Sequence, residues 1–128
     1  MSKKTTIETV HGVKQEISYS TNSMTHDEQE RLLTLITRVV DWHHDRNLIE
    51  GSTDKDQTLK LLQELGELSD SVCKGKDISD DIGDMLVVML NIVERNGLNL
   101  TKCLERAWSD IKDRKGKMVD GIFVKEGD

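Results

Sequence analysis

Two neighbouring segments of the chain each carry a pair of carboxylates three residues apart. The pairs are Glu64 with Glu67 in "KLLQELGEL", and Asp81 with Asp84 in "DIGDMLVVML". Residues at this spacing project from one face of a helix, so each pair presents its acids together. Hard oxygen ligands in this number suit Mg²⁺ or Mn²⁺. The alternative is a solvated helix face for the first pair and first-turn acids, favoured by the helix dipole, for the second. Apolar surroundings of both pairs favour a metal site.

Four helices are predicted to position these acids. Apolar residues at helical spacing predict helices over about 25–46, 53–75, 79–97 and 99–114. "THDE" from Thr25 is a capping box, Ser52 or Thr53 can cap the second helix, and Ser79 can cap the third. We therefore expect an all-α fold, a four-helix bundle.

The second and third helices are predicted to pack against each other in antiparallel directions. Only the short segment "GKDIS" joins them, and short connections favour antiparallel neighbours. Gly66 and Gly83 lie in the middle of these helices at a cost in helix propensity, which close helix approach would explain. Such packing brings the late acids of one helix opposite the early acids of the next.

Composition restricts the class of protein. The chain has 128 residues, which suits one domain, and its apolar content of 35% with 3% aromatic residues makes a lean core. That shortfall indicates burial between subunits, so an oligomer is expected. The net charge of −6 argues against binding to duplex nucleic acid, and a phosphate ligand would need bridging cations. No apolar stretch reaches the roughly 18 residues of a membrane span, so we expect a cytoplasmic protein without a membrane partner.

Both ends of the chain read as tails around one helical domain. Residues 1–23 show weak alternation and predict either a hairpin turning at Gly12 or a mobile arm. The helical domain is expected over 24–116. Residues 117–128 form a tail with one short strand at "GIFVK".

The two acidic segments together resemble the MazG-like family of all-α nucleoside triphosphate pyrophosphohydrolases, whose signature is EExxE followed by ExxD. "DRNLIEG" upstream and "IKDRKGKMVDGIFVKE" downstream look like small stand-alone members that phages often encode. The resemblance covers roughly Asp41 to Glu126. If phage-encoded, the protein would act in the host cytoplasm.

The resemblance implies a Mg²⁺-dependent enzyme that splits a nucleoside or deoxynucleoside triphosphate between its α and β phosphates, and assembly as dimers or tetramers. Glu64 and Glu67 match the second and third acids of EExxE, and Asp81 and Asp84 match ExxD, as metal ligands. Glu64 or Glu67 would be catalytic, with Glu64 chosen to accept the proton of the attacking water.

Two positions depart from the family signature. Gln63 stands where the first Glu is expected, and Asp81 replaces the Glu of ExxD. We interpret both as variation within an active site; a degenerate enzyme is the alternative. A related all-α dUTPase, a (p)ppGpp-type hydrolase and a non-catalytic helical binding module are the competing hypotheses. The sequence does not name the base.

Several further residues are candidates for substrate contact: Lys60, Arg114, Lys115 and Lys117 for phosphate, and Trp42 and Asn91 for base or sugar. Each has a structural alternative. Lys60 can form a surface ion pair with Glu64, and the "RKGK" cations around a flexible glycine can offset a helix dipole. Trp42 and Asn91 can belong to the core. The adjacent His43 and His44 diverge by about 100° on a helix and cannot chelate one zinc ion together.

Overall fold

The computed structural model describes residues 2–8, 14–20 and 24–127. The chain divides into two compact units, one of His26–Cys103 and the other of Met1–Thr25 with Leu104–Asp128. Each unit is described by itself.

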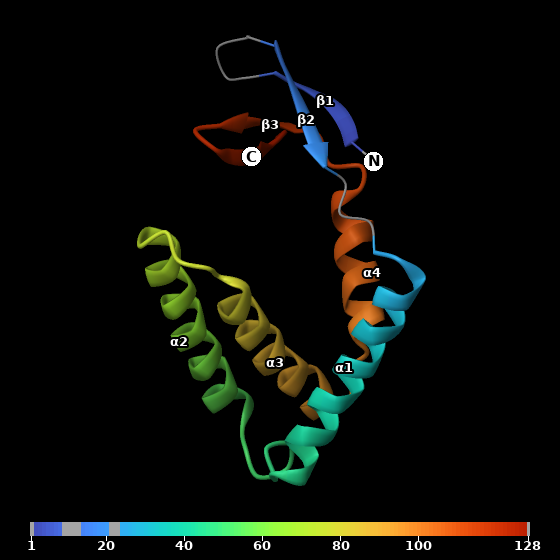
Figure 1. Cartoon of the computed structure of the whole chain (residues 1–128), viewed down its shortest axis with the longest axis vertical. Coiled ribbons are helices and arrows are strands. Elements are labelled where there is room, and N and C mark those ends of the chain that lie inside the picture. Colours follow the sequence, from blue (N-terminus) through green and yellow to red (C-terminus); the bar gives the residue numbers. More distant parts are fainter. Residues whose placement is uncertain (1, 9–13, 21–23, 128) are drawn as a thin grey trace. The chain divides into compact units, whose positions relative to one another are not determined.

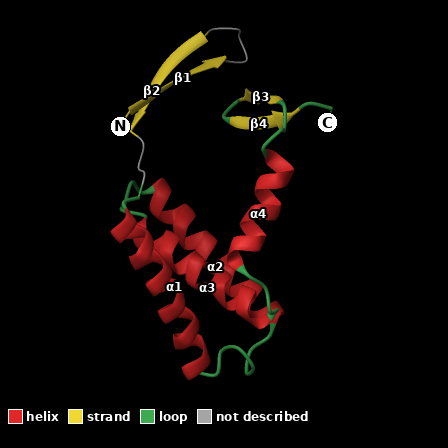
Figure 2. Ribbon diagram, turned by 90° about the vertical axis from the view of Figure 1, so that its right-hand side faces the viewer, coloured by secondary structure: helices red, strands yellow, loops and turns green. Residues whose placement is uncertain are grey.

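Four α-helices account for most of the described chain (Figure 1). They are α1 (His26–Asp45), α2 (Asp54–Cys73), α3 (Ser79–Arg95) and α4 (Leu100–Ile111). Figure 2 shows them in red, with the strands in yellow. The predicted all-α class and all four helices are confirmed. None of these helices combines the length with the apolar composition that crossing a bilayer would require.

Local signals account for most helix ends. Thr53 precedes α2, and its hydroxyl oxygen accepts a hydrogen bond from the Asp56 amide at 3.1 Å. Gly75 and Gly97 follow α2 and α3 with φ of +65° and +62°, the left-handed conformation that glycine adopts without strain. The prediction that Thr53 is a cap is confirmed.

The prediction that Ser79 caps α3 is wrong. Ile78 occupies the cap position without a side-chain hydrogen bond, and Ser79 is already the first helical residue. Instead, Asp77 Oδ1 accepts hydrogen bonds from the Ser79 amide at 2.9 Å and from its hydroxyl at 2.7 Å. The aspartate therefore makes the local turn that leads into the helix.

Helices α2 and α3 run antiparallel and pack on each other, and α1 also packs on α3 (Figure 1). The core of this unit holds two buried apolar side chains, Val88 and Leu90, both on α3. The expected glycine-mediated close approach is not found. A Cβ added at Gly66 or Gly83 would meet no atom within 4 Å, because both glycines face open space.

The loop between α1 and α2 is fastened to the end of α3. Arg95 Nε donates to Asp54 Oδ1 at 3.1 Å, and its guanidinium also donates to the Ile49 carbonyl. Asn96 Nδ2 donates to the same Asp54 oxygen at 3.2 Å. These bonds hold the loop beside the helices that carry the acids.

Two helices of this unit present apolar stripes to the surroundings. The exposed residues at helical spacing are Leu62, Leu65 and Val72 on α2, and Ile82, Leu86 and Met89 on α3. Soluble monomers rarely expose contiguous apolar surface of this kind. The stripes fit the lean core expected from composition.

The other unit contains two antiparallel hairpins. Strand β1 (Ser2–Glu8) pairs with β2 (Lys14–Ser20), with Ser2 opposite Ser20 and Glu8 opposite Lys14. This confirms the hairpin alternative for the N-terminal segment. The turn predicted at Gly12 lies outside the described residues.

The C-terminal segment is a hairpin and not a tail with a single strand. Strand β3 (Gly116–Val119) pairs with β4 (Ile122–Lys125). Asp120 and Gly121 connect them with φ of +50° and +81°, the left-handed pair that a tight hairpin turn requires. "GIFVK" contains the predicted strand. The partner strand was not predicted, although an Asp-Gly pair between two apolar segments is typical of a hairpin turn.

Candidate metal centre

Glu64 is a buried carboxylate on α2 with an exposed fraction of 6%. Its Oε1 lies 3.1 Å from Lys60 Nζ, one turn earlier on the same helix. Its Oε2 is buried and has no hydrogen-bond partner among the described residues. Burial of a charged oxygen without a partner is costly, so this atom is a candidate ligand for a cation.

Three carboxylates converge at this point. One oxygen each from Glu64, Glu67 and Asp84 lies within 4.8 Å of the others. Glu64 and Glu67 come from α2, and Asp84 comes from the early part of α3. Their helix spacing and the antiparallel packing bring the acids together, as predicted from the sequence.

The proximity of these acids raises the pKa of two of them, Glu67 and Asp84. Glu64 raises the pKa of Glu67, first through the hydrogen bond that a proton between the two carboxylates makes and then through charge repulsion. Burial raises the pKa of Asp84, and repulsion from Asp80, Glu64 and Asp81 adds to that effect. A bound cation would offset the repulsion among these carboxylates and the cost of burying the Asp84 charge.

The donor set fits a hard divalent cation. It offers oxygen ligands from three carboxylates, one of them with a buried oxygen that lacks a partner. Mg²⁺ is commonly held by a few carboxylates together with water and substrate phosphates. Glu64, Glu67 and Asp84 are therefore the residues that would hold Mg²⁺ or Mn²⁺.

Asp81 is not part of this three-acid cluster. It is half-buried on α3, and it lies one helical turn before Asp84. A short aspartate side chain one turn away does not bring its oxygens within the same distance of Glu64 and Glu67. The sequence thus predicts four ligands, and the structure brings together three of them.

An open cavity of about 350 Å³ adjoins the cluster. Its walls come from α1, the following loop, α2 and α3: Trp42, His43, Leu48, Gln57, Lys60, Glu64, Asp84, Val87 and Val88. A second cavity of about 470 Å³, which extends along α1 past Leu35 and Arg38, is also lined by Trp42, Asp84 and Val87. The acids therefore open onto space large enough for a small ligand.

Trp42 lines both cavities and is 43% exposed. The Arg46 guanidinium lies 4.5 Å from the centroid of its ring. The core alternative for Trp42 does not hold, because the indole is accessible beside the acids. Stacking of Trp42 on a base stays a prediction.

Lys60 forms the ion pair considered for it, and its contact with phosphate stays a prediction. It pairs with Glu64 and also contacts Gln63 Oε1 at 3.4 Å, and it lines the cavity beside the acids. Gln63, at the position of the family's first Glu, is exposed.

Asn91, predicted as a contact for base or sugar, is fully buried. Its exposed fraction is 0%, and it lines neither cavity beside the acids. Its Nδ2 donates to the Leu48 carbonyl at 3.0 Å and to His43 Nδ1 at 3.2 Å. The core alternative is therefore correct, since buried amides are retained where they satisfy backbone and ring acceptors.

The two histidines act separately, as expected. His43 Nε2 donates to the Val87 carbonyl at 2.9 Å, whereas His44 Nε2 lies 3.0 Å from Glu94 Oε1. The bond from His43 to Val87 assigns the proton to Nε2 and leaves Nδ1 to accept from Asn91. This network fastens α1 to α3, and the His43 ring lies 5.2 Å from the Trp42 ring, centroid to centroid.

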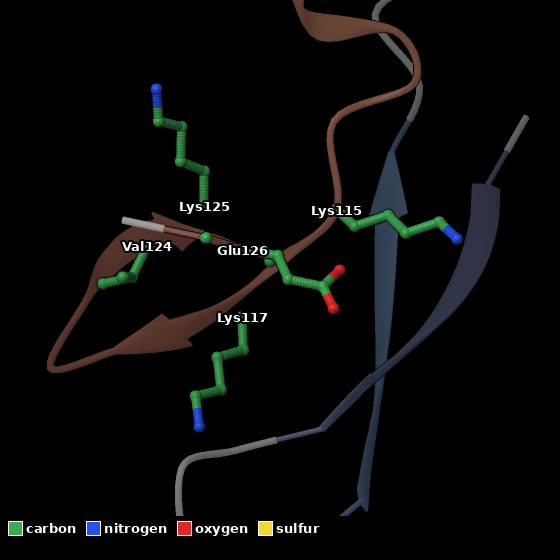
Figure 3. A pocket seen from close by; sticks show the side chains of 7 residues that line it. Lys115, Lys117, Val124, Lys125 and Glu126 are labelled. Carbon is green, nitrogen blue, oxygen red and sulfur yellow. The ribbon is translucent and has the colours of Figure 1, made fainter.

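The predicted phosphate-binding cations Arg114, Lys115 and Lys117 belong to the other compact unit. Lys115 and Lys117 line a cavity of about 520 Å³ on the C-terminal hairpin. Figure 3 shows Lys117 and Lys125 pointing to opposite sides of the hairpin, while Lys115 extends in a third direction, away from both. The lysines therefore do not converge on one anion within this unit.

Gly116 is not the flexible glycine that the sequence predicted. It lies in β3 opposite Lys125, and a Cβ there would overlap the backbone of β4 and the Phe123 ring. The glycine is needed because the strands approach closely at this point.

Sequence reasoning did not single out Gln57. It lines the cavity beside the acids, and its Nε2 lies 2.9 Å from Ser52 Oγ. The available signal was its spacing, because it precedes Lys60 and Glu64 by three and seven residues on one helix face.

The chain is similar to an uncharacterized 18.2 kDa protein from the rep–hol intergenic region of Haemophilus phage HP1 (strain HP1c1), with 43% identity over 70 residues. The match covers 53% of this chain but only 43% of the phage protein's length. The similarity agrees with the phage-type character expected from the flanking motifs. No family model matches the chain, and no solved structure matches it.

Proposed function

We propose that this chain is a MazG-like pyrophosphohydrolase that hydrolyses a nucleoside or deoxynucleoside triphosphate to a monophosphate and pyrophosphate, and so controls a nucleotide pool. The observation that carries the proposal is the three-acid cluster of Glu64, Glu67 and Asp84, with an unpartnered buried oxygen, beside a cavity lined by Trp42.

In this proposal the three acids hold Mg²⁺, or Mn²⁺ in its place. The cation supplies charge that offsets the phosphate oxygens and favours departure of pyrophosphate. The chain is acidic, with a net charge of −6, so a triphosphate needs such a partner to approach these carboxylates.

We assign the role of proton acceptor to Glu67 and not to Glu64, the residue chosen from the sequence. Glu64 is buried, and its Oε1 lies 3.1 Å from Lys60 Nζ, so an attacking water molecule has little access to this carboxylate. Glu67 is exposed in the same cluster, where a water molecule can reach it. Water attacks the α phosphorus, its proton passes to a Glu67 carboxylate oxygen, and the bond from the α phosphorus to the bridging oxygen breaks to release pyrophosphate.

The remaining cavity residues would orient the nucleotide. Lys60 lines the cavity beside Glu64 and would contact a phosphate oxygen. Trp42 offers an accessible indole for stacking on the base. The predicted phosphate contacts of Arg114, Lys115 and Lys117, which belong to the other compact unit, stay predictions.

A panel of ribonucleoside and deoxynucleoside triphosphates, with product analysis and pyrophosphate detection, tests the reaction. We expect Mg²⁺-dependent release of a monophosphate and pyrophosphate in a one-to-one ratio, and loss of turnover in EDTA. Release of orthophosphate and a diphosphate would contradict cleavage at the α–β bond. Strict preference for dUTP would place the chain with dUTPases, and the absence of turnover for every nucleotide would favour a binding module.

We also propose that the chain works as an oligomer, a dimer or tetramer, which would cover the apolar stripes of α2 and α3. Replacing Leu86 with Glu should shift the assembly toward monomer and lower its melting temperature, because a charge would enter the interface. Sedimentation equilibrium measures the first effect. Thr37→Glu, an exposed position on α1, which carries neither stripe, is the matched control. A wild-type chain that is monomeric throughout the micromolar range would contradict the proposal.

A further inference from the structure

The cavity beside the acids has two different polar ends on one face of α2. Gln57, Lys60 and Glu64 all line it, and their spacing places them along a single stripe of the helix. Gln57 lies seven residues before Glu64, an axial distance of about 10 Å. A ligand with phosphates at the acids would therefore place its far end near the Gln57 amide.

The Gln57 side chain is held in place by the turn that precedes α2. Its Nε2 lies 2.9 Å from Ser52 Oγ, and both residues are half-buried. This contact engages one hydrogen of the amide, so the carbonyl oxygen and the second N–H remain for a ligand. An adjacent acceptor and donor of this kind match the hydrogen-bonding edge of a nucleobase.

Trp42 gives the same cavity a flat wall. Its indole is accessible, and the Arg46 guanidinium lies 4.5 Å from the ring centroid. An aromatic ring stacks on any base with little preference among them. A fixed amide, in contrast, discriminates between bases by their donors and acceptors. Trp42 would thus stack on the base, and the Gln57 amide would discriminate between bases.

We propose that Gln57 determines base specificity by hydrogen bonding to the edge of a nucleobase that stacks on Trp42, with Ser52 holding the amide in position. The inference rests on the proposed function for the ligand being a nucleotide. It requires neither a bound cation nor turnover, because the base and the phosphates occupy different ends of the cavity.

Base binding can be measured without hydrolysis. The chain has two tryptophans, so in a Trp108→Phe background the fluorescence reports Trp42 alone. This protein would be titrated with the four deoxynucleoside monophosphates in EDTA. We expect one base to bind about tenfold or more tightly than the weakest, and Gln57→Leu to reduce that ratio below about threefold while weak quenching persists. Ser52→Ala should reduce it partially, because the amide loses its support.

Gln29→Leu on α1, which makes the same chemical change outside both cavities beside the acids, should leave the ratio unchanged. Circular dichroism and melting curves would show that each variant is folded. Absence of Trp42 quenching by every nucleotide, or an unchanged ratio in Gln57→Leu, would overturn the inference. Base-selective binding that Gln57→Leu abolishes, without any triphosphate turnover, would support the inference and contradict the proposed hydrolysis. Turnover with a base preference that Gln57→Leu leaves intact would overturn the inference alone.

Discussion

Replacement of Asp84 with Asn is expected to abolish Mg²⁺-dependent hydrolysis and, at the same time, to stabilise the metal-free protein. Asp84 is the only acid of the described three-acid cluster that α3 contributes. Its loss removes a ligand and a charge from the proposed metal centre. We expect the turnover rate to fall at least about 10³-fold, the equivalent of about 4 kcal/mol in the activation barrier.

The gain in stability follows from the repulsion that the cluster suffers without a cation. Burial and neighbouring acids raise the pKa of Asp84, and Glu64 raises the pKa of Glu67. A carboxyl group with a raised pKa binds its proton more tightly in the folded state than in the unfolded state. Its stabilising contribution is complete below the unfolded pKa and is lost as the pH rises through the folded pKa.

The wild-type protein in EDTA should therefore lose stability as the pH rises from about 4 toward neutrality. Asp84→Asn should reduce this loss. Mg²⁺ should restore wild-type stability at neutral pH, by about 2.7 kcal/mol at a hundredfold excess over its dissociation constant, but should leave Asp84→Asn unchanged. Melting curves across this pH range, recorded in EDTA and in Mg²⁺, measure both the loss of stability with pH and its restoration by Mg²⁺.

Two neighbours on the same helix provide matched controls. Asp80→Asn changes an exposed acid one turn before Asp84 and should retain most of the activity and the response to Mg²⁺. Asp81→Asn tests whether Asp81 is a fourth ligand of the metal. A small effect on Mg²⁺ binding would support a centre made of the three-acid cluster alone. Unimpaired hydrolysis by Asp84→Asn would contradict the proposed metal centre.

Asn91→Leu is expected to be among the most destabilising single changes in the helical unit. Asn91 is fully buried and donates to the Leu48 carbonyl and to His43 Nδ1. Leucine of similar size would leave both acceptors buried without a donor, at about 1–3 kcal/mol each. Because the substitution also removes Asn91 Oδ1, which has no partner in the described part of the chain, we expect a net loss of about 2–3 kcal/mol.

Urea denaturation with a constant slope would measure this loss as a shift of the midpoint. Asn96→Leu is the matched control, because Asn96 is exposed at the end of α3 and bonds to Asp54 and the Ile92 carbonyl. Asn96→Leu should lower the free energy of unfolding by less than about 1 kcal/mol. An Asn91→Leu protein with wild-type stability would show that the hydrogen bonds from this amide to the Leu48 carbonyl and to His43 Nδ1 contribute little. A destabilised variant should also show weaker quenching of Trp42 by nucleotides, since His43, which accepts from Asn91, contacts the Trp42 ring.

Helix boundaries and the acid pairs could be predicted because their signals are local. Thr53 satisfies a free amide of the first turn of α2, and Gly75 and Gly97 adopt a conformation that other residues avoid. Glu64 with Glu67 share a helix face by spacing alone. The Ser79 cap failed although its signal is also local, because the preceding Asp77 offered a better-placed acceptor.

Other features depend on distances across elements, which spacing does not determine. Gln57 shares a cavity with Trp42 only because α1 and α2 both contribute to its walls. The middle glycines, Gly66 and Gly83, were wrongly expected at a close helix contact, because the rotation of each helix about its axis decides which face meets its neighbour.

By itself, the sequence determined the all-α class, four helices, and two pairs of acids on adjacent helices, because hydrogen bonding within a few residues and the helical repeat control these features. Only the tertiary structure decided that Glu64, Glu67 and Asp84 converge while Asp81 stays outside, and that Asn91 is buried. The physical reason is that convergence and burial depend on the packing of α1, α2 and α3, to which every contacting side chain contributes at once.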